Sequence, residues 1–162
     1  PLAKNDFFAD RRSARPLVDG TIARGHLRED AALYTGKAGG KPVETFPFAV
    51  SAAVMARGQE RFDIFCAPCH GRTGAGDGMI VQRGYRKPPT FHEDRLRQAA
   101  PGYTFDVITN GFGAMPDYAQ QIPVRDRWAI VAYIKALQRS QHATIGQVPA
   151  AARAALESAD AR

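Results

Sequence analysis

The seven residues Phe65–Gly71, FCAPCHG, contain the only two cysteines of the 162-residue chain, Cys66 and Cys69, with His70 directly after them. Two thiols three positions apart with an adjoining imidazole are found in four kinds of site. These are a zinc ion, a thiol redox pair, a disulfide and a covalently attached haem. The sequence on either side of this stretch distinguishes among the four.

A structural zinc site and a disulfide are both disfavoured by the spacing. Zinc takes about four ligands in a tetrahedral arrangement, and Cys66, Cys69 and His70 are too close in sequence to supply three of them. The other histidines form no second ligand motif; they are His26, His92 and His142. A disulfide between cysteines only three residues apart has poor geometry.

The CAPC segment resembles the Cys-x-Pro-Cys pair of thioredoxin-like proteins, which is a redox site. That pair needs a buried strand before it, so that the first cysteine begins a helix. Here the preceding residues 50–65 have helical spacing instead: one face carries Val54, Gly58, Phe62 and Phe65, and the charged side chains lie largely elsewhere. The sequence context therefore disfavours a thiol redox pair.

Covalent haem attachment is the chemistry that this stretch fits. The thiols of a Cys-x-x-Cys-His motif add across the two haem vinyl groups, and the following imidazole reaches the iron. We therefore predict haem c on Cys66 and Cys69 with His70 as an axial ligand. The second ring nitrogen of His70 needs a hydrogen-bond acceptor, and a backbone carbonyl of the pair Pro88–Pro89 is our candidate.

Met115 is our candidate for the second axial ligand. It lies 45 residues after His70 in the segment NGFGAMPDYAQQIP, between two predicted helices. A segment of that length can pass around the edge of a haem and return on the opposite face. Gly111 and Gly113 allow a sharp turn there, and Pro116 restrains the residue that follows the methionine.

The other candidates for this ligand are weaker. Met55 precedes the haem motif on a predicted helix and fits a core position, and Met79 follows only nine residues after His70. His92 is the best alternative that is not a methionine. A small haem peroxidase or a gas sensor is also less favoured, because such proteins need an open or weakly held sixth position on the iron.

Two helices are predicted after the haem motif. Residues 103–110, YTFDVITN, form a short one that Gly111 ends. Residues 123–140, PVRDRWAIVAYIKALQRS, form a longer one, because Pro123 suits its first turn and one face is apolar. Residues 1–47 mix glycine, proline and charge without sustained periodicity, although aromatic residues such as Phe7 and Phe8 punctuate them.

Residues 54–138 resemble class I c-type cytochromes. The segment GQERFDIFCAPCHG is similar to that family's first helix and haem motif, and WAIVAYIKAL is similar to its last helix. The resemblance implies an all-α fold of three or four helices around one covalent haem, with the first and last helices crossing at Gly58. It also implies electron transfer as the function. Our candidates for the lining of the haem pocket are Phe62, Tyr85, Arg86, Pro88, Pro89, Phe112, Trp128 and Tyr133.

A wider resemblance extends over nearly all of residues 5–140. The segments DFFADRRSARPLVDGTIARG, RGYRKPPTF and VITNGFGAMPDY together resemble the mono-haem cytochrome c subunit of bacterial alternative complex III, a quinol-oxidising membrane assembly. The resemblance implies partner subunits with multihaem or iron–sulfur centres as electron donors. A terminal oxidase or a soluble carrier would be the acceptor, and the subunit would pack on the periplasmic face of the inner membrane.

We accordingly expect three sections in the chain: a long irregular N-terminal docking arm (residues 1–49), a mono-haem cytochrome c domain (50–140) and an alanine-rich tail (141–162). A free soluble cytochrome c that shuttles electrons is the alternative, although a shuttle gains nothing from such an arm. We expect a signal sequence upstream of Pro1, with or without a lipid anchor.

The charge and the hydropathy pattern exclude other classes of protein. The net charge is +6, but the basic residues are scattered and form no aromatic-interleaved stripe, so nucleic acid is not an expected partner. No apolar run approaches the roughly 18 residues that a membrane-spanning helix needs. We therefore expect no transmembrane helix in this chain.

Overall fold

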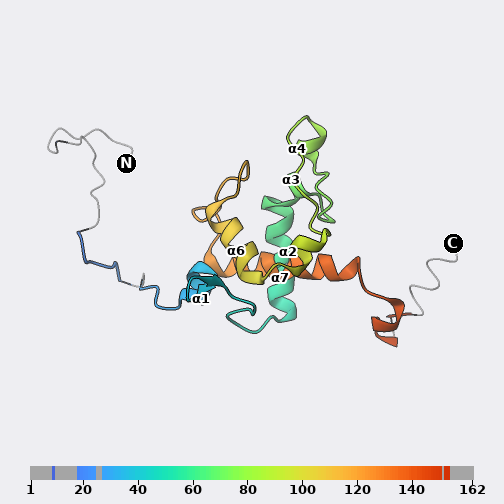
Figure 1. Cartoon of the computed structure of the whole chain (residues 1–162), viewed down its shortest axis with the longest axis horizontal. Helices are drawn as coiled ribbons and strands as arrows, with labels where there is room; N and C mark the ends of the chain where they lie inside the picture. Colours follow the sequence, from blue (N-terminus) through green and yellow to red (C-terminus); the bar gives the residue numbers. More distant parts are fainter. Residues whose placement is uncertain (1–8, 10–17, 25–26, 151, 154–162) are drawn as a thin grey trace.

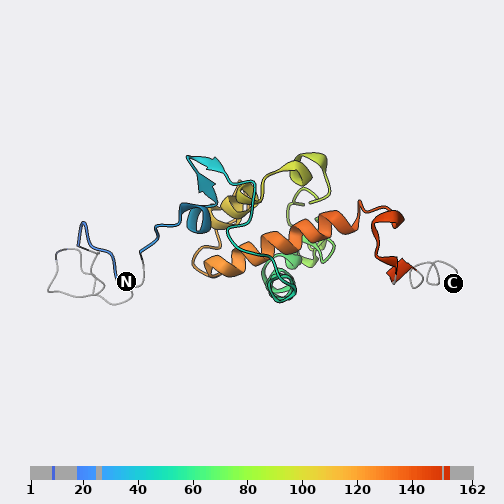
Figure 2. The ribbon, with the colours of Figure 1, turned by 90° about the horizontal axis from the view of Figure 1, so that it is seen from below.

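The computed structural model describes residue 9 and residues 18–24, 27–150 and 152–153. Its centre is a pair of crossing helices, α2 (Ala52–Phe65) and α7 (Val124–Ser140). In Figure 1 the upright α2 crosses the roughly horizontal α7, and in Figure 2 α2 is seen end-on while α7 is seen from the side. Helices α1 and α6 contact α7, and α3 contacts α2.

Helix α2 begins at Ser51, whose side chain accepts a hydrogen bond from the backbone nitrogen of Val54. Its one residue without a side chain, Gly58, lies at the crossing. A Cβ atom placed on Gly58 would be 2.1 Å from the carbonyl oxygen of Ala129 in α7. The two backbones can approach this closely only because of the glycine, so the crossing expected at Gly58 is confirmed.

Helix α7 has the bounds and the apolar face that the sequence predicts. Pro123 precedes its first residue, Asp126 lies in its first turn and Arg139 in its last, which suits the helix dipole. It supplies much of the core. The buried apolar side chains of the described residues are Phe62, Phe105, Ile108, Ile122, Trp128, Ala129, Ile130, Val131, Ala132 and Ile134.

Helix α6 (Pro101–Asn110) packs against α7 and ends at Gly111, which confirms the predicted stop. The remaining elements are short. They are α3 (Ala67–His70), α4 (Met79–Gln82), α5 (Asp94–Gln98) and the 3-10 turn η1 (Ile145–Gln147). The helical content and the arrangement confirm the predicted all-α class.

The segment before α2 packs on the helical domain. It is irregular except for α1 (Ala31–Thr35) and two antiparallel strands, β1 (Lys37–Ala38) and β2 (Lys41–Pro42). The indole Nε1 of Trp128 donates a hydrogen bond of 2.8 Å to the carbonyl oxygen of Leu33. Phe46 lies edge-on to the same indole, with the ring centroids 5.8 Å apart.

These contacts bear on the expected docking arm. Residues 31–48 lie against α6 and α7, so this part of the segment contributes to the domain core. Phe7 and Phe8, on which the docking idea rests, lie outside the described residues. The boundary at residue 49 therefore stays a prediction. Among the described residues, no helix combines the length and the apolar character that a bilayer crossing requires.

Replacing Gly58 by alanine should destabilise the protein, although alanine is ordinarily the better helix former by about 1 kcal/mol. The added Cβ would meet backbone atoms of α7 rather than a flexible side chain, and overpacking of this kind costs about 1–3 kcal/mol. Guanidinium chloride unfolding of the purified protein measures the change. The exposed neighbour Gln59, changed to alanine, is the matched control and should be close to neutral. An unchanged or higher midpoint for Gly58→Ala would contradict the close crossing.

Candidate haem-binding site

The cysteine–histidine motif forms one helical turn at the end of α2. The backbone nitrogen of Cys66 still donates to the carbonyl of Phe62 at 2.9 Å. The nitrogens of Cys69 and His70 then donate to the carbonyl of Cys66 at 3.1 and 2.8 Å. The motif is therefore held by the helix before it, as covalent attachment at two neighbouring vinyl groups requires.

Both cysteines are free thiols. Burial, with a smaller contribution from the neighbouring Cys69, raises the pKa of the Cys66 thiol to about 12. Redox-active cysteines have a lowered pKa, because the thiolate is the nucleophile. The environment of Cys66 therefore argues against a thiol oxidoreductase, as the sequence does.

His70 is held as a neutral imidazole. Burial lowers its pKa to about 4, so the ring carries no charge at neutral pH and keeps a nitrogen lone pair for a metal. Its Nδ1 atom is buried and has no hydrogen-bond partner among the described residues. The ring of Phe91 stacks on the imidazole, with centroids 4.5 Å apart and planes 17° apart.

The proline pair lies beside the loop that follows His70. A Cβ on Gly76 would be 2.5 Å from the carbonyl oxygen of Pro88, so the two loops are in contact. However, the predicted hydrogen bond from the His70 ring to a carbonyl of Pro88 or Pro89 is wrong for this structure, because Nδ1 has no acceptor there. The Pro88 carbonyl packs over the glycine instead.

Met115 lies in a tight hairpin after α6. The backbones of Phe112 and Met115 exchange two hydrogen bonds of 3.0 Å. Gly111 and Gly113 have φ values of +78° and +58°, a region that favours glycine. A Cβ on Gly111 would also come within 2.6 Å of the Met115 carbonyl oxygen. The Met115 side chain is half-buried against the core.

The hairpin is anchored beyond Met115 by Tyr118, whose backbone nitrogen donates to the carbonyl of Ile108 in α6 at 3.0 Å. The ring of Tyr118 contacts Phe65, the last residue of α2, with centroids 6.4 Å apart. This contact joins the hairpin that carries Met115 to the helix that carries the cysteines. The two halves of the candidate site are thus connected through a pair of aromatic rings.

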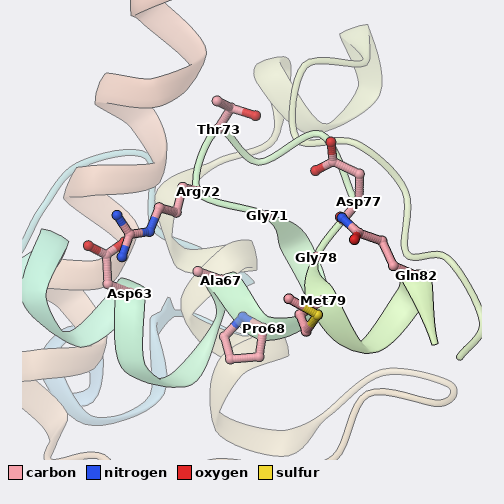
Figure 3. Close-up of a pocket in the computed structure, with 10 residues that line it drawn as sticks. All are labelled: Asp63, Ala67, Pro68, Gly71, Arg72, Thr73, Asp77, Gly78, Met79 and Gln82. Atoms are coloured by element: carbon pink, nitrogen blue, oxygen red, sulfur yellow. The ribbon is translucent and has the colours of Figure 1, made fainter.

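The two other methionines lie elsewhere. Met55 is half-buried within α2, and Met79 begins α4 with 55% of its surface exposed. Met79 borders an open hollow of about 450 Å³ on the outer side of the cysteine–histidine turn (Figure 3). That hollow is lined by neither cysteine, by neither candidate axial ligand, and by none of the predicted pocket aromatics. In Figure 3 the side chain of Arg72 points toward Asp63 on its rim.

The predicted pocket residues fall into two groups. Phe62, Trp128 and the half-buried Tyr133 belong to the core or pack against it. Phe62 lies edge-on to Tyr133, and Trp128 stacks on Phe105 on the side that α1 covers. The second group lies at the surface of the chain: Tyr85 is 70% and Phe112 68% exposed, Arg86 and Pro89 are exposed, and Pro88 is half-buried.

Three residues with contacts at this site were missed from the sequence: Phe65, Phe91 and Tyr118. Phe65 was placed on the apolar face of its helix but was not assigned to the pocket. Phe91 follows the proline pair by two residues, so the motif PPTF contained a usable signal. Tyr118 had no comparable signal, because its contact with Phe65 joins positions 53 residues apart.

The residues present fit a haem. They offer two free thiols on one helical turn and a neutral, half-buried imidazole with an unpartnered nitrogen. They also offer large apolar side chains, those of Tyr85 and Phe112, that the protein alone leaves exposed.

A family model described as "Cytochrome C oxidase, cbb3-type, subunit III" matches residues 53–134, about half of the chain.

The chain belongs to this cytochrome c family. Membership establishes the class I c-type cytochrome fold and implies a covalently bound haem c with electron transfer as its function. The matched residues run from the first turn of α2 to the middle of α7 and contain both the cysteine–histidine motif and the Met115 hairpin.

One solved structure shows the same fold. A chain of the reducing HAO-like protein complex of Kuenenia stuttgartiensis matches with a TM-score of 0.50 and 21% sequence identity. The match covers 66% of this cytochrome and 54% of that chain, so this cytochrome spans about half the length of that chain. No curated protein sequence matches.

Removing both predicted attachment thiols, as Cys66→Ala with Cys69→Ala, should leave a chain that is largely unfolded. The haem would otherwise cover the exposed aromatics and engage His70, and binding to the native state stabilises it. Far-UV circular dichroism during heating measures the effect. The surface variant Gln59→Ala, loaded with haem, serves as the control. A cooperative, native-like melt of the haem-free double variant would contradict a structural role for the haem.

Proposed function

We propose that this cytochrome carries single electrons through one covalent haem c, attached to Cys66 and Cys69, with His70 and Met115 as axial ligands. The observation that carries the proposal is the helical turn on which both thiols are free and the His70 imidazole is neutral and half-buried. The iron supplies the chemistry, cycling between ferrous and ferric forms without making or breaking substrate bonds.

The residues of the chain hold the two ligands in fixed positions. His70 is constrained by the turn hydrogen bonds and by the ring of Phe91. Met115 is constrained by the paired backbone hydrogen bonds of its hairpin and by Tyr118. Rigid ligands keep the change in geometry on electron gain or loss small, which suits a carrier. Two strong axial ligands would also leave no open position for oxygen chemistry.

The exposed residues of the predicted pocket have a role in this proposal. Tyr85 and Phe112 present large rings with little protein cover, and a haem would bury part of that surface. Arg86, the neighbour of Tyr85 in sequence, carries a positive charge that suits a haem propionate. The site is supported from the core side by Phe62, Tyr133 and Trp128. The loop that carries Phe91 is shaped by Pro88 and Pro89.

We further propose that the protein is a subunit of a quinol-oxidising membrane complex resembling alternative complex III, on the periplasmic side of the inner membrane. Donors would be multihaem or iron–sulfur subunits, and the acceptor a terminal oxidase or a soluble carrier. The long segment before α2 supports this, because a freely diffusing carrier gains little from it. The solved relative comes from a multi-subunit complex, which agrees with partner subunits in general terms.

The chemical part of the proposal is tested by a pyridine haemochrome spectrum of the purified protein. It should show one haem c per chain that remains attached after denaturation. A non-covalent haem, or a stoichiometry other than one, would overturn the assignment. Fractionation of the native cells, followed by purification from the membranes, separates a fixed subunit from the alternative, a free soluble cytochrome c.

Two N-terminal truncations test the docking role. Deleting residues 1–29 should leave the haem spectrum and the stability unchanged but lower retention in the membrane complex. Deleting residues 1–49 should in addition lower the melting temperature, because it removes the Leu33 carbonyl and the Phe46 ring that contact Trp128. Co-purification and thermal melting measure the two effects. Full retention of the shorter deletion would contradict docking by this segment.

Replacing Met115 by histidine should lower the reduction potential while the haem stays six-coordinate and low-spin. A thioether is a neutral, soft ligand that favours ferrous iron, whereas imidazole favours ferric iron comparatively more. Axial-ligand identity is one of the factors that spread haem potentials over about 0.8 V. Redox titration measures the shift.

The matching controls are Met55→Leu and Met79→Leu, which should keep the potential and the spectrum. Met115→Ala should open the sixth position and admit carbon monoxide. The assignment fails if the weak sulfur-to-iron charge-transfer band survives in Met115→Ala and disappears in Met79→Leu.

A further inference from the structure

The ring of Phe91 lies between His70 and the core. It stacks on the imidazole at 4.5 Å and 17°, and it meets Phe62 edge-on with centroids 6.2 Å apart and planes 61° apart. Phe62 is completely buried. The imidazole is therefore supported on one face by a ring that is itself supported by the core.

The backbone of Phe91 is held at both of its polar groups. Its nitrogen donates to the carbonyl of Gly74 at 2.9 Å, and its carbonyl accepts a hydrogen bond of 2.8 Å from Nε2 of Gln138. Gln138 belongs to α7 and is only 6% exposed. Gly74 must remain a glycine, because a Cβ there would be 2.7 Å from the Phe91 ring and its φ is +80°.

We propose that Phe91, held in place by Gln138, is a positioning residue that fixes the plane of the His70 imidazole. The inference rests on the proposed role of His70 as an axial ligand. Helix α7, which carries no ligand, thereby controls the orientation of one. The route is Gln138 to the Phe91 backbone, and the Phe91 ring to the imidazole.

The physical basis is the near-parallel stack. An imidazole 17° from a neighbouring ring plane can rotate only by losing that contact or by displacing Phe91. The stack covers one face of the imidazole, so the support from Phe91 acts on the plane of that ring.

The competing explanation is that Gln138 only stabilises the fold. A variant of Lys135 distinguishes this explanation from the positioning role. Lys135 lies on the same helix one turn earlier and donates to the carbonyls of Arg97 and Ala99, at 3.0 and 2.7 Å. Arg97 lies in the last turn of α5 and Ala99 follows that helix, whereas Gln138 donates to Leu96 of α5 at 3.2 Å as well as to Phe91. Lys135 therefore anchors the same helix without a hydrogen bond to Phe91. Losing either hydrogen-bond set should cost stability, but only the Gln138 set should affect the ligand.

The experiment uses the haem-loaded, oxidised protein and its low-temperature electron paramagnetic resonance spectrum, whose g values report the orientation of the axial ligand planes. Phe91→Leu and Gln138→Leu should each shift or broaden the largest g value. Phe91→Tyr keeps a flat ring and should retain the wild-type signal, as should Lys135→Met. Phe91→Ala removes the supporting ring and should change the largest g value at least as much as Phe91→Leu does.

The inference is overturned if Phe91→Leu and Gln138→Leu both keep the wild-type g values. It is equally overturned if Lys135→Met changes the g values as much as Gln138→Leu does, because the effect would then be general loosening. If Phe91→Ala does not fold, the leucine variants decide. If the wild-type protein itself shows no low-spin histidine–methionine ligation, the proposed function is refuted instead.

Discussion

The close backbone approach of α2 and α7 at Gly58 is the constraint on which the rest of the structure depends. A Cβ on Gly58 would lie only 2.1 Å from the carbonyl oxygen of Ala129, so the helices can cross this closely only at the glycine. The two helices therefore cannot shift along each other. The cysteine–histidine turn begins eight residues after the crossing. Its position relative to α7 is therefore fixed by a contact that involves none of the site residues.

Two sides of helix α7 contact different parts of the protein. Toward α1 and α6 it presents Trp128, which stacks on Phe105 and donates to the Leu33 carbonyl. Toward the candidate haem site it presents Tyr133 against Phe62, and Gln138 against the Phe91 carbonyl. One helix, which carries neither of the proposed ligands, thus organises both the N-terminal packing and the support of His70, the proposed axial ligand.

Charged contacts add little to this arrangement. Arg57 of α2 forms a two-point ion pair with Asp126 of α7, with nitrogen–oxygen distances of 3.0 and 2.7 Å, and Glu60 joins it on the surface. Exposed pairs of this kind contribute about 0–1 kcal/mol. They help set the angle of the two helices, whereas the buried aromatic and aliphatic residues provide the free energy.

The sequence alone determined the features that depend on local spacing. The thiols and the imidazole on one turn, the helix of residues 124–140 with its apolar face, and the glycines of the Met115 hairpin all follow from neighbours within a few positions. Tertiary structure alone decided which distant groups meet. The Pro88 carbonyl packs on Gly76 rather than accepting from His70, Leu33 receives the Trp128 hydrogen bond, and Phe91 stacks on the imidazole. Each of these contacts joins residues 12 to 95 positions apart, and their geometry depends on how the helices cross, which no local pattern encodes.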